Sequence, residues 1–294
     1  MALAVSAGVL AAAAFLPVSQ IRAETKGIDT SRILVAGGAI TEILYELGVS
    51  GRIVAVVTTS QFPAEALKTK KSIGYLRALS TEGVLSMAPS VIIASDKAGP
   101  PEVVRALKAS GVPYVEIDDT PSPTALLDRI RAVAAVVEKA EDGSRIVARV
   151  AADLEALSAL RREAGAPIPT LFILSLQNGR VLVGGRNTAA DTMLKLANGR
   201  NVAEAIDGFK PMTEEMLISL DPHAIVTMTR SSGAPLADEL KRIPAIQATT
   251  AGKTGAFVEM DALFLMGFGP RTPAAARELM DQLRPTSLKA HVDR

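Results

Sequence analysis

Glu82-Gly-Val-Leu-Ser-Met-Ala-Pro89 leads into Val91-Ile92-Ile93, and the same order returns in Glu215-Met-Leu-Ile-Ser-Leu-Asp-Pro222, which leads into Ala224-Ile225-Val226. In each copy a short segment begins at a glutamate, carries apolar residues at helical intervals and stops at a proline, and a strand of the buried type follows. The repeat predicts one helix–strand unit that is used twice. Two similar lobes, with one such unit in each, favour a cleft that closes on a ligand from both sides.

Short apolar segments alternate with helical ones along both halves of the chain. In the first half the predicted strands are residues 33–36, 53–57, 91–94 and 114–117, and the predicted helices are 41–47, 81–87 and 102–109. In the second half the predicted strands are 170–174, 181–183, 224–228 and 256–259. The alternation predicts an α/β fold of two doubly wound lobes with parallel sheets.

Residues 144–163 carry apolar side chains at three- and four-residue steps, and a glycine stands on each side, at Gly143 and Gly165. This pattern predicts one helix of about 30 Å, at 1.5 Å per residue. We expect residues 143–165 to join an N-terminal lobe (24–142) to a C-terminal lobe (166–294) as a stiff strut that limits closure to small angles. The alternative is that the helix packs on one lobe as part of its core.

Composition narrows the class of protein. The chain has 294 residues, 48% of them hydrophobic, which is enough for two domains with buried cores. The formal net charge is only +1, and no basic cluster is interleaved with aromatic residues. Nucleic acid is therefore a poor candidate partner.

Residues 1–23 resemble a secretory signal, because an apolar stretch up to Leu16 gives way to polar residues and ends at Ala23. No other stretch approaches about 20 uninterrupted apolar residues, so we expect no stable membrane insertion. The chain contains no cysteine and hence no residue for a lipid anchor. These features predict an exported protein that diffuses freely in a periplasm.

Few residues are suited to catalysis. The absence of cysteine excludes thiolate nucleophiles and cysteine-based metal sites, and the two histidines, His223 and His291, stand at a strand edge and in the C-terminal tail. No nucleotide-binding glycine motif and no nucleophile elbow occur. Gly37-Gly38 and Gly184-Gly185 could offer backbone N–H groups to an anion, but tight turns explain them more simply. We therefore expect a protein that is not an enzyme.

Tyr75 is the residue whose position singles it out, in the loop Ile73-Gly74-Tyr75-Leu76-Arg77. Of the three tyrosines, Tyr45 falls in a predicted helix and Tyr114 begins a predicted strand, whereas Tyr75 follows a glycine at the edge of the sheet where such folds bind ligands. Arg77 could donate to the phenolic oxygen and stabilise its anionic form. A phenolate suits ferric iron, and tyrosine is known as a haem ligand.

Together these residues resemble the haem-binding periplasmic proteins of bacterial haem ABC importers, whose two lobes are joined by one long helix. The resemblance covers residues 31–283 and rests on three runs in order: Gly74-Tyr-Leu-Arg77, Thr188-Ala-Ala-Asp191 and Gly267-Phe-Gly-Pro-Arg271. It implies that Tyr75 is the axial ligand of ferric haem b and that Arg77 hydrogen-bonds to it. Some members place a histidine just before the second run, where this chain has Gly185-Arg186-Asn187, so we expect no second strong protein ligand.

The resemblance also implies a docking role for the repeated glutamates, since related proteins present such a pair to arginines of their permease. Glu82 and Glu215 fall at equivalent points of equivalent units, as docking on a two-fold symmetric transporter would require. The alternative is that each only stabilises the dipole of its own helix.

Lys97 and Arg230 are the candidate partners of the haem propionates. Each follows the strand of a repeated unit, at the ligand end of its sheet. The alternative is that both are solvated loop cations.

We therefore expect a monomeric periplasmic carrier that holds haem between two lobes and delivers it to an ABC permease with its ATPase subunit. A carrier for cobalamin or an iron–siderophore would share the fold and the paired glutamates. A haem-modifying or metal-dependent hydrolytic enzyme would need a nucleophile–base pair, which the sequence does not offer.

Overall fold

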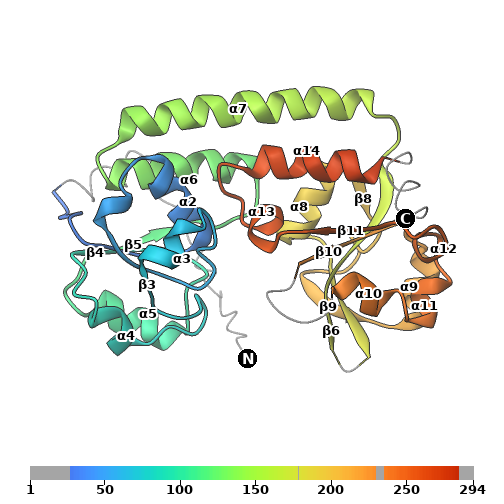
Figure 1. The fold of residues 1–294 in the computed structure, drawn as a ribbon, viewed down its shortest axis with the longest axis horizontal. Coiled ribbons are helices and arrows are strands. Elements are labelled where there is room, and N and C mark those ends of the chain that lie inside the picture. Colours follow the sequence, from blue (N-terminus) through green and yellow to red (C-terminus); the bar gives the residue numbers. More distant parts are fainter. Residues whose placement is uncertain (1–26, 178, 230–234, 285–294) are drawn as a thin grey trace, which may run out of the picture.

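The computed structural model describes residues 27–177, 179–229 and 235–284, and the description below concerns these ranges. They form two α/β lobes with one long helix running along both, so the predicted fold class is confirmed (Figure 1). The predicted signal at 1–23 and Arg230 lie outside the described residues. Within those ranges no helix combines the length and the apolar character that crossing a membrane requires.

The first lobe is built on a five-stranded sheet in the order β3-β2-β1-β4-β5, and all of its strand pairs are parallel. Its strands are β1 (Ile33–Ala36), β2 (Ile53–Val56), β3 (Lys71–Ser72), β4 (Val91–Ser95) and β5 (Tyr114–Ile117). Its helices are α2 (Gly38–Glu46), α3 (Glu65–Thr69), α4 (Thr81–Leu85), α5 (Pro101–Lys108) and α6 (Pro123–Val136), with a 3-10 turn at Ser50–Arg52.

Both faces of this sheet are buried, and β1 shows why. Ile33 and Val35 pack into one apolar cluster with residues of α2 and α6, whereas Leu34 and Ala36 pack into a second cluster with residues of α4 and α5. Alternate residues of a strand point to opposite faces, so a strand covered on both sides must be apolar throughout. The uninterrupted apolar runs of the sequence follow from this arrangement.

The second lobe contains a six-stranded sheet in the order β11-β10-β6-β7-β9, with β8 beside β6. Its strands are β6 (Ile168–Gln177), β7 (Arg180–Gly184), β8 (Gly199–Asn201), β9 (Phe209–Met212), β10 (Ala224–Met228) and β11 (Phe257–Met260). Its helices are α8 (Ala189–Leu196), α9 (Glu214–Leu220), α10 (Leu236–Leu240), α11 (Pro244–Gln247), α12 (Thr250–Thr254), α13 (Ala262–Met266) and α14 (Thr272–Leu283).

The second sheet is mixed, so the expectation of a parallel sheet in this lobe is wrong. β7 is antiparallel to both β6 and β9, whereas β10 is parallel to β6 and β11. Only residues 178 and 179 separate β6 from β7. Two residues suffice for a hairpin, whereas a parallel crossover needs a dozen or more.

The repeated unit is present in both lobes, and the two copies share a backbone hydrogen bond at the same position. α4 leads to β4, which pairs with β1, and α9 leads to β10, which pairs with β6. Directly after the proline of each copy, the Ser90 N–H donates to the Arg32 carbonyl (2.9 Å) and the His223 N–H donates to the Pro169 carbonyl (2.8 Å). His223 thus occupies the position that Ser90 holds in the first copy, as the sequence predicts.

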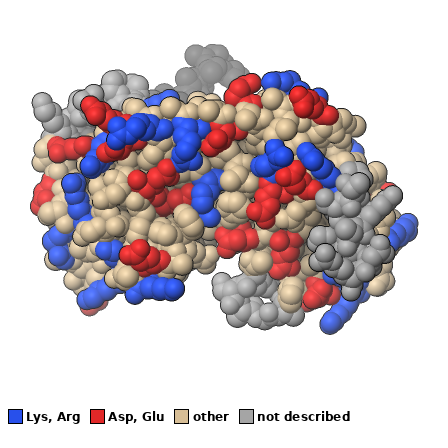
Figure 2. Space-filling view, turned by 45° about the horizontal axis from the view of Figure 1, so that its top comes forward, with Lys and Arg blue, Asp and Glu red and all other residues tan. Residues whose placement is uncertain are grey.

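The long helix is α7 (Ala140–Glu163), which begins four residues before the predicted segment. At 1.5 Å per residue it is about 36 Å long. It packs on α6 of the first lobe and on α14 and α8 of the second, along one side of the molecule (Figure 1). On the face drawn in Figure 2, acidic and basic side chains are interspersed, in keeping with the near-neutral net charge.

Candidate functional site

A cavity of about 530 Å³ lies between the two lobes, a size typical of sites for small molecules. The first lobe contributes residues that follow the carboxyl ends of its strands, among them Gly37, Thr59, Tyr75 and Lys97. Loops at this edge of a parallel sheet are the usual binding position in doubly wound folds. The predicted cleft between the lobes is therefore present.

The second lobe supplies much of the apolar wall of this cavity. Leu174, Phe209 and Met228 come from its sheet, and Leu263, Met266 and Phe268 come from α13 and the turn after it. A wall of aliphatic and aromatic side chains favours a ligand with an apolar surface over a strongly hydrated one. Thr188 and Gly267, at the starts of two of the sequence runs that carry the resemblance, also line this space.

Tyr75 stands on a loop whose backbone is held at both flanks. The Gly74 carbonyl accepts from the Thr58 N–H (2.9 Å), and the Leu76 carbonyl accepts from the Gly99 N–H (3.0 Å). Gly74 has a φ of 90°, a left-handed conformation that glycine adopts without steric cost. The Tyr75 side chain lines the cavity and is 49% exposed, so its hydroxyl is accessible to a ligand.

The other two tyrosines are packed in the protein. Tyr45 packs against the core of the first lobe, and the hydroxyls of Tyr45 and Tyr114 are buried without a hydrogen-bond partner. Burial raises the pKa of the Tyr114 phenol to about 12, and the nearby Glu116 carboxylate adds to the rise. Among the described residues, Tyr75 is thus the one tyrosine that lines the cavity.

Arg77 and Lys97 are brought to the same cavity as Tyr75. Arg77 is exposed, and no hydrogen bond joins it to the Tyr75 hydroxyl in the described structure. The Lys97 ammonium is paired with the Asp96 carboxylate at 2.7 Å, and its side chain is 49% exposed. Lys97 can therefore reach an anion in the cavity while it shares its charge with Asp96.

Asn187 lies where the resemblance places a histidine in some family members. It lines the cavity, and its Nδ2 donates to the Asp207 Oδ1 at 2.8 Å. An amide held in this way is a weak metal ligand. In the described ranges no group of three or more histidine, aspartate or glutamate side chains is arranged to hold a bare metal ion.

Asp119 is a cavity residue that the sequence analysis missed. It follows β5 at the ligand edge of the sheet and lies in the cavity wall, where its Oδ2 accepts from the Ser95 hydroxyl (3.1 Å) and its Oδ1 pairs with Arg129 (3.0 Å). Burial raises the pKa of this carboxyl, while the charge of Arg129 opposes the rise. Its position two residues after a predicted strand, at the same edge as Lys97, was the available signal.

The first glycine pair serves close packing between the lobes. A Cβ on Gly38 would lie 2.6 Å from the Thr59 carbonyl oxygen and 2.8 Å from a methyl group of Leu263. This close approach leaves no room for a side chain at Gly38, which lines the cavity.

Glu82 and Glu215 are not among the residues that line the cavity, and they lie at matching places of the two repeated units. Both are exposed in the first turn of their helices, α4 and α9, which Figure 1 shows in opposite lobes and away from α7. Each helix has a hydroxyl N-cap, with Ser80 accepting from the Gly83 N–H (3.0 Å) and Thr213 accepting from the Met216 N–H (3.3 Å). Hydrogen bonds from its own backbone N–H and from Thr213 lower the pKa of Glu215.

Comparison with known proteins places the chain in a family. A family model described as periplasmic binding protein matches residues 33–263. The periplasmic haem-binding protein RhuT of Roseiflexus sp. RS-1 is 35% identical with a TM-score of 0.81, over 87% of this chain and 100% of that chain. The haem-binding protein BhuT, solved with two haems, is 33% identical with a TM-score of 0.81, over 87% of this chain and 98% of that chain.

A vitamin B12-binding protein of Vibrio vulnificus is 23% identical over 258 residues, which are 85% of this chain and 89% of that relative. The family model covers most of the chain, and both solved structures share its two lobes. The chain belongs to the periplasmic binding protein family.

Proposed function

We propose that this protein is a periplasmic haem carrier that holds ferric haem b between its lobes and delivers it to an ABC permease driven by an ATPase subunit. The observation that carries the proposal is the position of Tyr75, an accessible phenol on a well-anchored loop at an apolar interlobe cavity. The likeness to RhuT and BhuT, both named for haem binding, supports it.

Each cavity residue has a role in this proposal. Tyr75 is the axial ligand, because a phenolate oxygen binds ferric iron well. Arg77, on the same loop, turns toward the bound phenolate and stabilises its negative charge. Lys97 pairs with one propionate, and the apolar residues of the second lobe cover the porphyrin face. Arg230, which lies outside the described residues, is proposed from the sequence alone as the partner of the other propionate.

The carrier acts as a monomer and without catalysis. Its chemistry is reversible ligation of the iron and burial of the porphyrin, and neither step requires a nucleophile or a general base. Release occurs at the permease, and the loaded carrier diffuses to it through the periplasm.

A cobalamin carrier is the second candidate, and the vitamin B12-binding relatives favour it. Their identity to this chain is lower, at 23% for the Vibrio vulnificus protein against 35% for RhuT. Tyr75 distinguishes the two functions, since a haem carrier without a second strong ligand depends on this phenolate and a cobalamin carrier does not.

The test is an absorption titration of the purified protein with hemin, beside parallel titrations with cobalamin and a ferric siderophore. We expect hemin to give a saturable high-spin spectrum of the tyrosinate type, and Tyr75→Phe to abolish it. Tyr45→Phe and Tyr114→Phe are matched controls, because each removes a buried hydroxyl that has no hydrogen-bond partner. Saturable binding of cobalamin alone, or an unchanged hemin spectrum in Tyr75→Phe, would contradict the proposal.

A further inference from the structure

The two lobes touch directly behind the cavity, at the turn of residues 267–271 that connects α13 to α14. Gly267 and Phe268 line the cavity, and Arg271 immediately precedes α14. This turn belongs to the second lobe, yet its polar contacts reach side chains of the first. The same turn therefore forms part of the cavity wall and part of the contact between the lobes.

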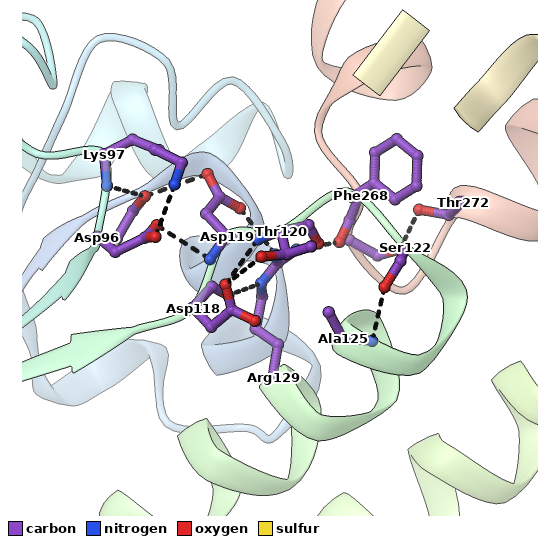
Figure 3. Close-up of polar contacts among 12 residues, drawn as sticks. Asp96, Lys97, Asp118, Asp119, Thr120, Ser122, Ala125, Arg129, Phe268 and Thr272 are labelled. Carbon is purple, nitrogen blue, oxygen red and sulfur yellow. Dashed lines mark hydrogen bonds and ion pairs between the residues drawn. The ribbon is translucent and has the colours of Figure 1, made fainter. Parts of the chain in front are cut away.

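Arg129 reaches the turn from α6 of the first lobe and is completely buried. Its Nη1 donates to the Phe268 carbonyl at 2.7 Å, across the lobe boundary. Within its own lobe it donates to the carbonyls of Asp118 (2.8 Å) and Thr120 (3.2 Å) and pairs with Asp119 (Figure 3). A guanidinium with this many fixed partners has little freedom to move, so it anchors the turn.

Arg271 makes the reverse connection, from the second lobe into the first. Its Nη2 and Nε donate to the Glu42 Oε2 at 3.0 and 3.1 Å, and its backbone N–H donates to the Glu42 Oε1 at 3.0 Å. Glu42 lies on α2 and its side chain is only 5% exposed. The Arg271 guanidinium also stacks 3.5 Å from the ring centre of Phe62, a residue of the first lobe.

The turn needs these contacts to keep its shape. Phe268 has a φ of 48°, a left-handed conformation that is unfavourable for a bulky residue. Gly269 passes so close to Glu42 that a Cβ there would lie 3.0 Å from the carboxyl group. A strained backbone persists where its surroundings hold it, and here the carbonyl of the strained residue is the one that Arg129 holds.

Asp119 connects this contact to the cavity. Its carboxyl lies in the cavity wall with 31% of its side chain exposed, and it pairs with the buried Arg129. The other groups facing it are the Ser95 hydroxyl and the charges of Asp96 and Lys97, and its own N–H donates to the Asp96 Oδ1 (3.0 Å). An occupant of the cavity therefore meets the carboxyl that orients Arg129.

We propose that Arg129 and Arg271 form a reciprocal clasp between the lobes, which fixes the width of the cavity, and that Asp119 is the positioning residue that ties this clasp to the ligand. The clasp consists of Arg129 with the Phe268 carbonyl and Arg271 with Glu42. Its consequence for ligand retention rests on the proposed haem function, but its effect on the lobes does not. Opening the clasp widens the cavity and speeds ligand release.

The first test measures the distance between the lobes without any ligand. The chain has no cysteine, so spin labels can be placed at Lys68→Cys on α3 and Lys253→Cys on α12, both exposed. Lys68→Cys with Arg105→Cys on α5 gives a control pair within the first lobe. We expect a narrow interlobe distribution in the parent, a broader or longer one in Arg129→Met and in Glu42→Gln, and an unchanged intralobe distance.

Matched controls distinguish the effect of opening the clasp from the effect of removing any arginine. Arg131→Met on α6 removes a guanidinium paired with Asp128, and Arg277→Met on α14 removes one paired with Asp281, each within its own helix. Neither should change the interlobe distance. If Arg129→Met fails to fold, Glu42→Gln still decides the matter, because glutamine has nearly the size of glutamate but lacks the charge and replaces one of the two oxygens that accept from Arg271 by an NH2 group.

The second test measures hemin transfer from each variant to an excess of an unrelated apo acceptor. We expect release about tenfold faster from Arg129→Met, a size usual for coupling between sites, and intermediate from Asp119→Asn and Arg129→Lys. Unchanged interlobe distances in both Arg129→Met and Glu42→Gln would overturn the clasp. Changed distances with unchanged hemin release would overturn its link to the ligand, and failure of the parent to bind hemin would refute the haem function while leaving the distance result valid.

Discussion

At the scale of single residues, the candidate site depends on a short loop whose backbone is held by hydrogen bonds and whose side chains are exposed. The backbone around Tyr75 is tied to the end of β2 and to Gly99, while the side chains of Tyr75 and Arg77 remain exposed at the cavity. A fixed backbone places the phenol reproducibly, and free side chains let it adjust to an iron atom. This division suits a carrier that must both bind and release.

Arg77→Ala should weaken haem retention by roughly tenfold and make it more sensitive to acid. Hydrogen bonds to charged groups are worth about 1.5–3 kcal/mol when sheltered and less at an exposed position such as this one. Without the neighbouring cation the bound phenolate is protonated more readily, so ligation should fail at a higher pH than in the parent. The measurement is the hemin spectrum followed through an acid titration.

Arg77→Lys keeps the charge and should recover much of the retention. Arg105→Ala on α5 removes an exposed arginine away from the cavity lining and should behave as the parent. Superimposable acid titrations of Arg77→Ala and the parent would remove Arg77 from the site.

At the scale of elements, α7 is joined to the first lobe through close packing on α6. Gly143 of α7 faces Ala134 of α6, and a Cβ added to the glycine would lie 2.3 Å from the alanine Cβ. Gly143→Val should therefore separate the two helices and lower the free energy of unfolding by about 1–3 kcal/mol, as overpacking usually does.

Denaturant unfolding of Gly143→Val and the parent measures this effect. Ser144→Val places the same side chain on the next, exposed position of α7 and is the matched control. Equal stability of Gly143→Val and Ser144→Val would show that the two helices tolerate a wider separation.

The elements also show what the sequence can and cannot predict. Strands such as β1 and β10 were predicted at their observed limits, because a strand buried on both faces is an apolar run bounded by turn residues. α6 was missed because it is buried on several sides, so its apolar residues form no single stripe. The hairpin between β6 and β7 was missed although the sequence carries Asn178-Gly179, a strong hairpin signal.

The candidate site also contains residues that the sequence predicts and one that it does not. Tyr75 was predicted to be near the ligand because it follows a glycine at the binding edge of the sheet, Arg77 because it stands two residues on, and Lys97 because it follows a strand at the same edge. The structure places all three at the cavity. Arg129 could not be found by such reasoning, since an arginine within a helix suggests a solvated face. Its partner at Phe268 is 139 residues away in sequence, and only the folded lobes bring them together.

At the scale of the whole molecule, the repeat places one exposed acidic group on each lobe, and we propose that this pair contacts a two-fold symmetric permease. Glu82 and Glu215 are exposed in the first turns of α4 and α9, and neither lines the cavity. Reversing both charges should therefore leave the hemin spectrum and affinity intact while haem transfer to the permease falls. An exposed charge pair contributes only about 0.2–1 kcal/mol, so each single reversal should be mild and the double variant clearly worse.

The decisive measurement is haem uptake by the reconstituted transporter from loaded carrier, over a series of salt concentrations. Transfer from the parent should weaken as ionic strength rises, because salt screens exposed charges beyond about 10 Å at 0.1 M, and the double variant should be less sensitive to salt. Glu102→Lys with Glu214→Lys is a control with the same change in net charge. Both residues are exposed in the first turn of a helix, Glu102 in α5 and Glu214 in α9 beside Glu215. Normal transfer by Glu82→Lys/Glu215→Lys would reduce both glutamates to the role of stabilising the dipoles of their own helices.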